Sequence, residues 1–236
     1  MDVNNNIALH DLCVFLREER VLIISDLHLG YEESLTDKGI LIPHSQFEKT
    51  DHRILTTIKV LEPKIIIFNG DFKHNFGVVQ ASEWRQGLQL LAAIAKQGTR
   101  VFAIEGNHDP TVGPLLRKAK VYCGTQLLVG NKLITHGDHV PQEAARKDIK
   151  TIIIGHEHPA LVVREGQRKE SYKCFLVGKW KNKRLIVMPS YNLITEGSDV
   201  LSVNMLSPFL QHSLGSFHVI AVGERLLDFG LVRDLK

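Results

Sequence analysis

The sequence predicts an α/β protein in which two stacked, mixed β-sheets are flanked by helices. Three observations lead to this prediction. Short β-branched apolar segments alternate with helical patterns over the first two-thirds of the chain, hairpin signals dominate the last third, and polar residues follow almost every apolar segment. The chain has 236 residues, a length that suits one α/β domain with a substantial core. We therefore expect a single domain over residues 1–236.

Four apolar segments are expected to form buried strands, because each is rich in β-branched residues and ends in turn-forming residues. They are residues 20–25, 64–68, 100–105 and 150–155. Helical patterns near residues 45–61 and 82–97 separate the first three, and the second helix has Ser82 as a candidate N-cap and Gly98 as a candidate stop. Strand–helix–strand alternation implies parallel pairing. In parallel sheets, the loops at the carboxyl ends of the strands carry the chemistry.

The later part of the chain has a different pattern. Residues 126–136 and 173–188 each contain turn-forming residues between two apolar segments, as in a hairpin. Two more apolar segments follow near the C-terminus. These features predict a second sheet that is partly antiparallel. Residues 189–215 have no clean period, and we predict that they form a long loop that can fold over the site.

Composition and charge narrow the class of protein. Three widely spaced cysteines without a Cys-x-x-Cys pair argue against a disulfide framework and favour the cytoplasm. The N-terminus lacks the pattern of a secretory signal, and no apolar run approaches the roughly 20 residues of a membrane helix. We therefore expect no membrane partner. The net charge of +3 permits a polyanionic partner without requiring one.

Candidate metal ligands follow the predicted strands. The motifs in chain order are Asp26-x-His28, Gly70-Asp71, Gly106-Asn107-His108-Asp109, His136-Gly137 and Gly155-His156-x-His158. This mixture of imidazole, carboxylate and carboxamide donors suits Mn²⁺, Fe or Zn²⁺ better than Ca²⁺. There are more donors than one ion needs, and a carboxylate such as Asp71 can bridge two ions about 3.5–4 Å apart. Glycines beside the ligands let the backbone turn sharply near the metals.

The spacing of His156 and His158 allows a further expectation. In an extended chain, side chains two residues apart point to the same side, and the residue between them points away. On this argument the two imidazoles share one side of the chain. Glu157 points the opposite way and needs no role.

The five ordered motifs, from residue 26 to residue 158, resemble those of the calcineurin-like metallophosphoesterases. This resemblance implies a four-layer αββα sandwich and two divalent metal ions, with Mn²⁺ preferred and Fe or Zn²⁺ as alternatives. It implies that the first metal is held by Asp26, His28, Asp71 and His158. It implies that the second metal is held by Asp71, Asn107, His136 and His156. In the family, the histidine equivalent to His108 faces the substrate, where it protonates the leaving oxygen or stabilises charge at phosphorus.

Departures within the resemblance narrow the substrate class. Glu105 stands where the protein phosphatases carry an arginine, and His108 stands where the lipid-A pathway hydrolases carry one. His74 lies three residues after Asp71, and this spacing is similar to that of the SbcD-type DNA repair nucleases, in which the equivalent histidine helps to position the strand. A solvated loop histidine is the alternative reading of His74. The segments Gly30-Tyr31-Glu32 and 188–192 extend the resemblance to small single-domain phosphoesterases related to SbcD.

These features predict a phosphodiesterase that hydrolyses nucleic acid, with an activated water as nucleophile. The chain has no room for the DNA-capping domain of the full repair nucleases, which favours single-stranded DNA or RNA as substrate. A DNA-repair protein such as a helicase or ligase is the expected partner. One alternative is a small-molecule phosphodiesterase, acting on nucleotides or cyclic nucleotides, or a phosphomonoesterase. Another is an interaction subunit, like the scaffold proteins of this fold that have lost catalytic residues. An open basic groove would favour the nuclease, and a closed pocket under residues 189–215 would favour the small-molecule enzyme.

Overall fold

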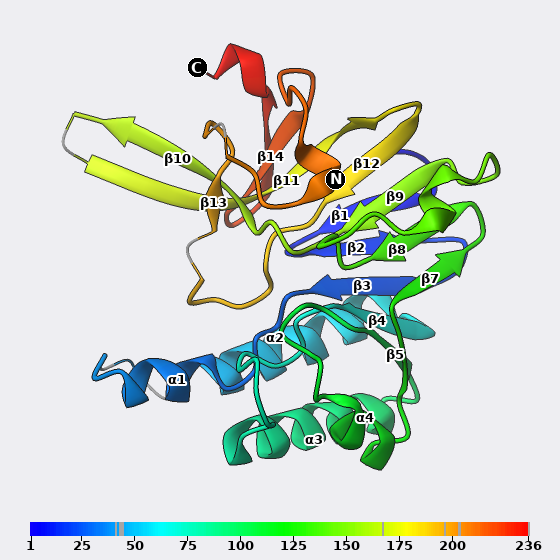
Figure 1. The fold of residues 1–236 in the computed structure, drawn as a ribbon, viewed down its shortest axis with the longest axis vertical. Coiled ribbons are helices and arrows are strands. Elements are labelled where there is room, and N and C mark those ends of the chain that lie inside the picture. The colour runs from blue at the N-terminus through cyan, green and yellow to red at the C-terminus, as the bar shows by residue number, and fades with distance from the viewer. Residues whose placement is uncertain (41, 43–44, 167, 196, 203, 236) are drawn as a thin grey trace.

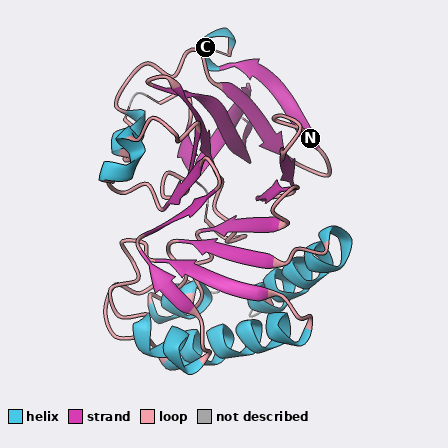
Figure 2. Cartoon of the chain, turned by 90° about the vertical axis from the view of Figure 1, so that its right-hand side faces the viewer, coloured by secondary structure: helices cyan, strands magenta, loops and turns pink. Residues whose placement is uncertain are grey.

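The structure is a computed structural model that describes residues 1–236 except 41, 43–44, 167, 196, 203 and 236. Two β-sheets lie face to face, and the α-helices lie against the outer face of the first sheet (Figures 1 and 2). Among the described residues, no helix is both long and apolar enough to cross a bilayer. The predicted α/β class and the stacking of two mixed sheets are confirmed.

The first sheet has the strand order β1-β2-β3-β4-β5-β6. Its strands are β1 (Ile7–His10), β2 (Cys13–Leu16), β3 (Val21–Ser25), β4 (Ile65–Asn69), β5 (Arg100–Ile104) and β6 (Tyr122–Gly124). The strands from β3 to β6 are parallel, and β1 and β2 add an antiparallel hairpin at one edge that the sequence patterns did not indicate. The parallel strands therefore end together at one edge of the sheet.

Within the described residues, four α-helices connect the strands of the first sheet. They are α1 (Tyr31–Asp37), α2 (Gln46–Leu61), α3 (Ala81–Lys96) and α4 (Gly113–Lys118). The two long helices are within one residue of the predicted bounds. The predicted cap of α3 was wrong by two residues: Gln80 is the N-cap, and its backbone N–H donates to Glu83 Oε2 at 2.7 Å. The short helix α1 was not predicted.

The second sheet has the order β13-β10-β11-β12-β9-β8-β7, and β14 and β15 extend it from β11. Its strands are β7 (Gln126–Val129), β8 (Lys132–Thr135), β9 (Thr151–Ile154), β10 (Pro159–Glu165), β11 (Arg168–Trp180), β12 (Lys183–Val187), β13 (Ser198–Asp199), β14 (His218–Val222) and β15 (Leu226–Leu231). The hairpins β7–β8, β11–β12 and β14–β15 confirm the antiparallel character expected of this region. The ribbon of β10 and β11, which projects from the body in Figure 1, was not predicted.

Three apolar clusters separate four layers. One lies between the helices and the first sheet, and contains Ile58, Leu91 and Phe68. Another lies between the two sheets, where Ile23 and Ile67 of the first sheet join a cluster with residues of the second. The last covers the outer face of the second sheet, where 3₁₀-helices η1 (Gln142–Ala145) and η2 (Pro208–Leu210) pack. The strands β3, β4, β9 and β12, which lie inside the sheets and are covered on both faces, are mostly apolar, whereas the first half of β11 and the middle of β15 are exposed.

Candidate metal centre

The candidate ligands lie where strands of both sheets end side by side. Asp26 and Asp71 follow the neighbouring strands β3 and β4, and His136 and His156 follow the neighbouring strands β8 and β9. Backbone hydrogen bonds continue between these loops beyond the strands: the N–H of His28 donates to the carbonyl of Asp71 at 2.9 Å, and that of Gly155 to His136 at 2.8 Å. The ladder thus holds the ligand loops in register with the strands.

Two groups of potential ligands meet within this space, and ligand atoms within each group lie within 4.8 Å of one another. The first group is Asp26, His28, Asp71 and His158. The second group is Asp71, His136 and His156. Asn107 joins the second group, because its Oδ1 lies 3.0 Å from His136 Nε2. These are the two sets that the sequence resemblance implied, and Asp71 belongs to both.

The charges in this space fit divalent cations. Burial and the adjacent Asp26 carboxylate raise the pKa of Asp71, since two buried negative charges repel each other. Burial lowers the pKa of His28 well below its usual value, which keeps its imidazole neutral. Neutral imidazoles and carboxylates are the forms that bind metals. The Nε2 atoms of His28 and His158 face each other at 3.4 Å, as donors to a shared cation would. The donor set therefore fits two divalent ions.

Five of the candidate ligands have left-handed backbone conformations. Their φ angles are 57° at Asp26, 47° at His28, 45° at Asp71, 65° at His156 and 50° at His158. Such a conformation costs a residue with a side chain about 1–2 kcal/mol. Backbone strain of this kind collects at functional sites, where the surrounding structure fixes it.

The left-handed conformations correct one sequence argument. His156 and His158 lie in the loop between β9 and β10 and are not extended, so the alternation of a strand does not apply to them. Each nevertheless belongs to a different ligand group. Glu157 also has a structural role that the sequence argument denied: it is buried, and its Oε2 accepts from the backbone N–H groups of Leu206 and Ser207 at 2.8 and 2.9 Å.

Glycines make room for the ligands. A Cβ on Gly70 would lie 1.9 Å from His136 Nδ1, and one on Gly106 would lie 2.2 Å from Asp71 Oδ1. A Cβ on Gly155 would lie 2.4 Å from Asp26 Oδ2. Each of these glycines directly precedes a candidate ligand and accommodates another ligand from a neighbouring strand end.

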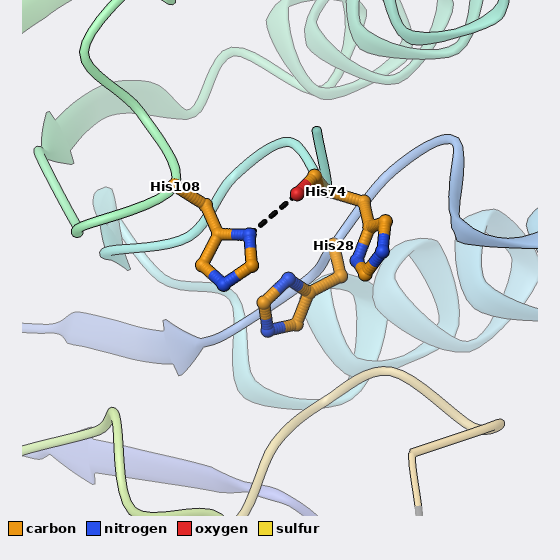
Figure 3. Close-up of side chains that lie close together, drawn as sticks. All are labelled: His28, His74 and His108. Carbon is orange, nitrogen blue, oxygen red and sulfur yellow. Dashed lines mark hydrogen bonds between the residues drawn. The ribbon is translucent and has the colours of Figure 1, made fainter. Parts of the chain in front are cut away.

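His108 is oriented toward the two ligand groups. Its Nδ1 donates to the backbone carbonyl of His74, as Figure 3 shows. A carbonyl can only accept, so the Nδ1 position carries the proton. Nε2 then faces the ligands, 3.9 Å from Asp71 Oδ2. His108 can therefore hold a second proton, at Nε2, for transfer to an oxygen beside the metals.

His74 lies beside both His28 and His108 in Figure 3, with ring centroids 5.5 and 5.6 Å away, respectively. The three histidines form a further cluster whose ligand atoms come within 4.8 Å of one another. Among the described residues, Nδ1 of His74 and Nδ1 of His28 are buried and have no hydrogen-bond partner. His74 thus lies beside the ligand groups and is not part of either, and its role in positioning a strand stays a prediction.

Two buried charged residues, Lys73 and Asp109, hold the loop after β4, and no sequence pattern indicated the first. Lys73 is fully buried, and its Nζ donates to the backbone carbonyls of Asn75 and His108. Asp109 accepts from the backbone N–H groups of Phe72, Lys73 and Gly106. A lysine beside a loop motif is usually expected at the surface, and nothing in the neighbouring sequence indicates that Lys73 is buried.

The segment 189–215 contacts the ligand loops through its described residues. Ser190 Oγ donates to the carbonyl of Asp26 at 2.9 Å, and Asn192 Nδ2 donates to the carbonyl of Leu27 at 2.9 Å. These contacts brace the backbone from which Asp26 and His28 project. The segment also contains β13 and η2, so it is not one continuous loop. Residues 196 and 203 of this predicted loop lie outside the described residues.

Comparison with known proteins agrees with this architecture. Residues 19–160 match the family model described as "Calcineurin-like phosphoesterase". The structure is similar to that of nuclease MPE from Pseudomonas putida, with a TM-score of 0.69, 15% identity and coverage of 93% of this chain and 92% of that one. It also matches the phosphoesterase YfcE from E. coli, with a TM-score of 0.44, 16% identity and coverage of 89% and 98%. No curated protein sequence matches the chain.

The family model covers the strands and loops that supply every candidate ligand, from Asp26 to His158. The likeness to the nuclease supports the fold. The chain belongs to the calcineurin-like phosphoesterase family, whose members are metal-dependent phosphoester hydrolases.

Proposed function

We propose that this protein is a dinuclear-metal phosphodiesterase that cleaves single-stranded nucleic acid. The observation that carries the proposal is the arrangement around Asp71, which belongs to both ligand groups while His108 Nε2 faces it at 3.9 Å. This arrangement supports a role for His108 as a proton donor beside two bound cations. Among the alternatives of Mn²⁺, Fe and Zn²⁺, we propose Mn²⁺ as the preferred metal.

The residues around the centre have separable roles in this reaction. Asp26, His28 and His158 would hold one ion with Asp71, and Asn107, His136 and His156 would hold the other. When bound, two divalent ions would stabilise charge on the phosphoryl oxygens and make a water more acidic. His108 donates the proton at Nε2 to the leaving oxygen, because its Nδ1 remains bonded to the His74 carbonyl.

The way into the centre supports a polymeric substrate. The side chains of Asp26 and His136 are 0% exposed, whereas those of His108 and His158 are 17% and 18% exposed. Solvent therefore reaches the ligand groups from the side of His108 and His158. His74 lies on this side as well, within ring contact of His108. A strand that passes this opening could present one phosphate to the metals.

A basic face begins beside the centre. Arg164 pairs with Lys169, and Ala160 pairs with Lys173, so the three cations lie on one face of the β10–β11 ribbon. Lys173 Nζ donates to Thr195 Oγ1 at 2.9 Å, in the segment that braces Asp26. A ribbon with this charge suits the phosphates of a polyanion. This feature favours a nucleic acid over a small phosphomonoester.

The similar structure of nuclease MPE gives further support, since that protein is described as a nuclease. At 15% identity, this structural likeness alone does not assign a substrate to the chain. A helicase or ligase of DNA repair as partner, and a cytoplasmic location, stay predictions of the sequence.

A substrate panel with added Mn²⁺ tests the proposal. Single-stranded DNA, duplex DNA, RNA, a cyclic nucleotide and a phosphomonoester are compared at equal enzyme concentration. We expect cleavage of the single-stranded polymers, and loss of that cleavage after the metal is removed by a chelator. The Asp71→Asn variant, purified in parallel, reports any contaminating nuclease. Hydrolysis of the cyclic nucleotide or monoester without cleavage of any polymer would replace the nuclease by a small-molecule enzyme.

A further inference from the structure

Four rings form a row beside the metal ligands. The ring of Tyr31 lies over that of His74 with centroids 4.2 Å apart and planes 33° apart. His74 and His108 are 5.6 Å apart at 35°. Phe76 then lies 3.7 Å from His108 at 31°. Both histidines of the row lie at the open side of the centre, and the ring of Tyr31 or Phe76 packs against each of them.

Phe76 is exposed although its position is fixed. It is 59% exposed, while one of its faces packs on the His108 ring. The residues on both sides of it are anchored: the N–H of Asn75 donates to Glu83 Oε1 at 2.8 Å, and the carbonyl of Gly77 accepts from Thr111 Oγ1 at 2.6 Å. A phenyl ring in a loose loop would gain by folding onto apolar surface. The hydrogen bonds of the two neighbouring residues keep the Phe76 ring exposed.

We infer that Phe76 is a nucleobase-stacking residue that positions the base next to the scissile phosphate. The inference rests on the proposed nuclease function and deepens it. Planar bases stack on aromatic side chains largely without regard to sequence. A base that stacks on Phe76 is one ring away from His108, whose Nε2 faces the metal ligands. The adjoining phosphate is then held near the leaving-group proton donor.

This assignment also gives a physical reason for selecting single strands. A base inside a duplex already has neighbours on both faces and can stack on Phe76 only after it leaves the helix, which costs free energy. For a single-stranded base, this free-energy cost is smaller or absent, because the base is unpaired and has fewer stacked neighbours. Phe76 therefore acts as a specificity-determining residue. Tyr31, which covers His74, is the second ring of the same platform.

The competing explanation is that Phe76 only holds His108 in place. A comparison of two oligonucleotides separates these roles. One carries thymine at every position, and the other replaces the bases around the cleavage site by abasic residues. We expect the wild-type protein to have a higher kcat/KM for the thymine strand, mainly through a lower KM. The Phe76→Ala variant should reduce this preference by roughly 5- to 150-fold, the range for one base stacked on one aromatic ring.

Two further variants sharpen the experiment. Phe76→Trp keeps a ring that stacks and should retain the preference, whereas Phe76→Leu fills a similar volume without a ring and should lose it. Val78→Ala is the matched control, since Val78 is 76% exposed on the same loop and carries no ring that could stack on a base. If Phe76→Ala lowers kcat equally for both strands, the ring only supports His108 and the inference is overturned. If the wild type cleaves neither strand but hydrolyses a small phosphodiester, the proposed function itself fails.

Discussion

The candidate centre has a closed side and an open side that are built differently. On the closed side, Asp26 and His136 come one residue after β3 and β8, and Asp71 comes two residues after β4. On the open side, His108 and His158 each come four residues after their strands. The first set has side chains 0–3% exposed and the second set 17–18%.

This difference relates the distance of a residue from the end of its strand to the function of that residue in the centre. A residue directly after a strand is held by the ladder and lies between the two sheets, where a metal can be enclosed. A residue several positions further on has left the ladder and reaches the surface, where a substrate arrives. The closed side should therefore control metal content. On the open side, His108 should control turnover, whereas His158 belongs to a ligand group and should affect metal content as well.

The largest expected effect comes from the closed side. Asp71→Asn removes the charge shared by both ligand groups, so we expect loss of both metals and of detectable phosphodiester hydrolysis. Metal content after dialysis against Mn²⁺ and hydrolysis of a bis(nitrophenyl) phosphate measure the two losses together. Asp148→Asn, which changes an exposed carboxylate paired with Arg146, should alter neither. A variant at Asp71 that keeps both metals would contradict the bridging position.

Gly70→Ala tests the same side without removing any ligand. The new methyl group would collide with the His136 ring, at a φ of 80° that an L-residue rarely adopts. We expect the metal stoichiometry to fall from two toward one, with activity falling with it. Gly77→Ala is the control, since a Cβ there meets nothing within 4 Å. Normal metal content in Gly70→Ala would show that His136 is not a ligand.

His108→Ala should separate the two sides. We expect both metals to stay bound while hydrolysis slows roughly 10²- to 10⁴-fold, the usual loss on removing a general acid. His108→Asn offers an amide that can still bond to the His74 carbonyl but cannot deliver the proton, so it should be slowed as much. Metal analysis and turnover on the small diester are the measurements. Normal turnover in either variant would remove the proton-donor role.

The smallest and most selective effect is expected at His74. His74→Ala should raise the KM for single-stranded DNA by roughly 10- to 150-fold, as for one lost hydrogen bond to a charged group, and should change the small diester much less. His212→Ala, at an exposed histidine far along the chain, controls for the loss of an imidazole. Equal effects of His74→Ala on both substrates would end its assignment as a strand-positioning residue.

The sequence alone predicted the strands that carry the ligands, because β-branched segments ending in Gly, Asp and Asn have strong local signals. The family resemblance of the ordered motifs also implied the two sets of residues that cluster in the structure. The role of Glu157 was missed because its partners lie 49 and 50 residues away. The burial of Lys73 was missed for the same reason, since its contact with the His108 carbonyl spans 35 residues. Local patterns describe strand ends well and tertiary partners poorly.

The geometry of His156 and His158 shows a second limit. The i, i+2 argument assumed extended backbone, and the structure has left-handed residues there. A loop conformation of this kind depends on hydrogen bonds from outside the segment, such as that from the His156 N–H to the Asp26 carboxylate at 3.2 Å. No periodic pattern in ten residues could indicate it.

Two of the glycines beside the ligands, Gly70 and Gly155, have a consequence for how such a centre assembles. Gly70 leaves space for a histidine from the other sheet, and Gly155 leaves space for an aspartate from the first. Each sheet thus has a glycine that leaves space for a ligand side chain from the other sheet. A fragment with only the first sheet would lack His136, His156 and His158 and would therefore have no complete site for two ions. Metal affinity should therefore depend on how well the two sheets pack against each other. Bound metal would in turn stabilise the contact between the two sheets.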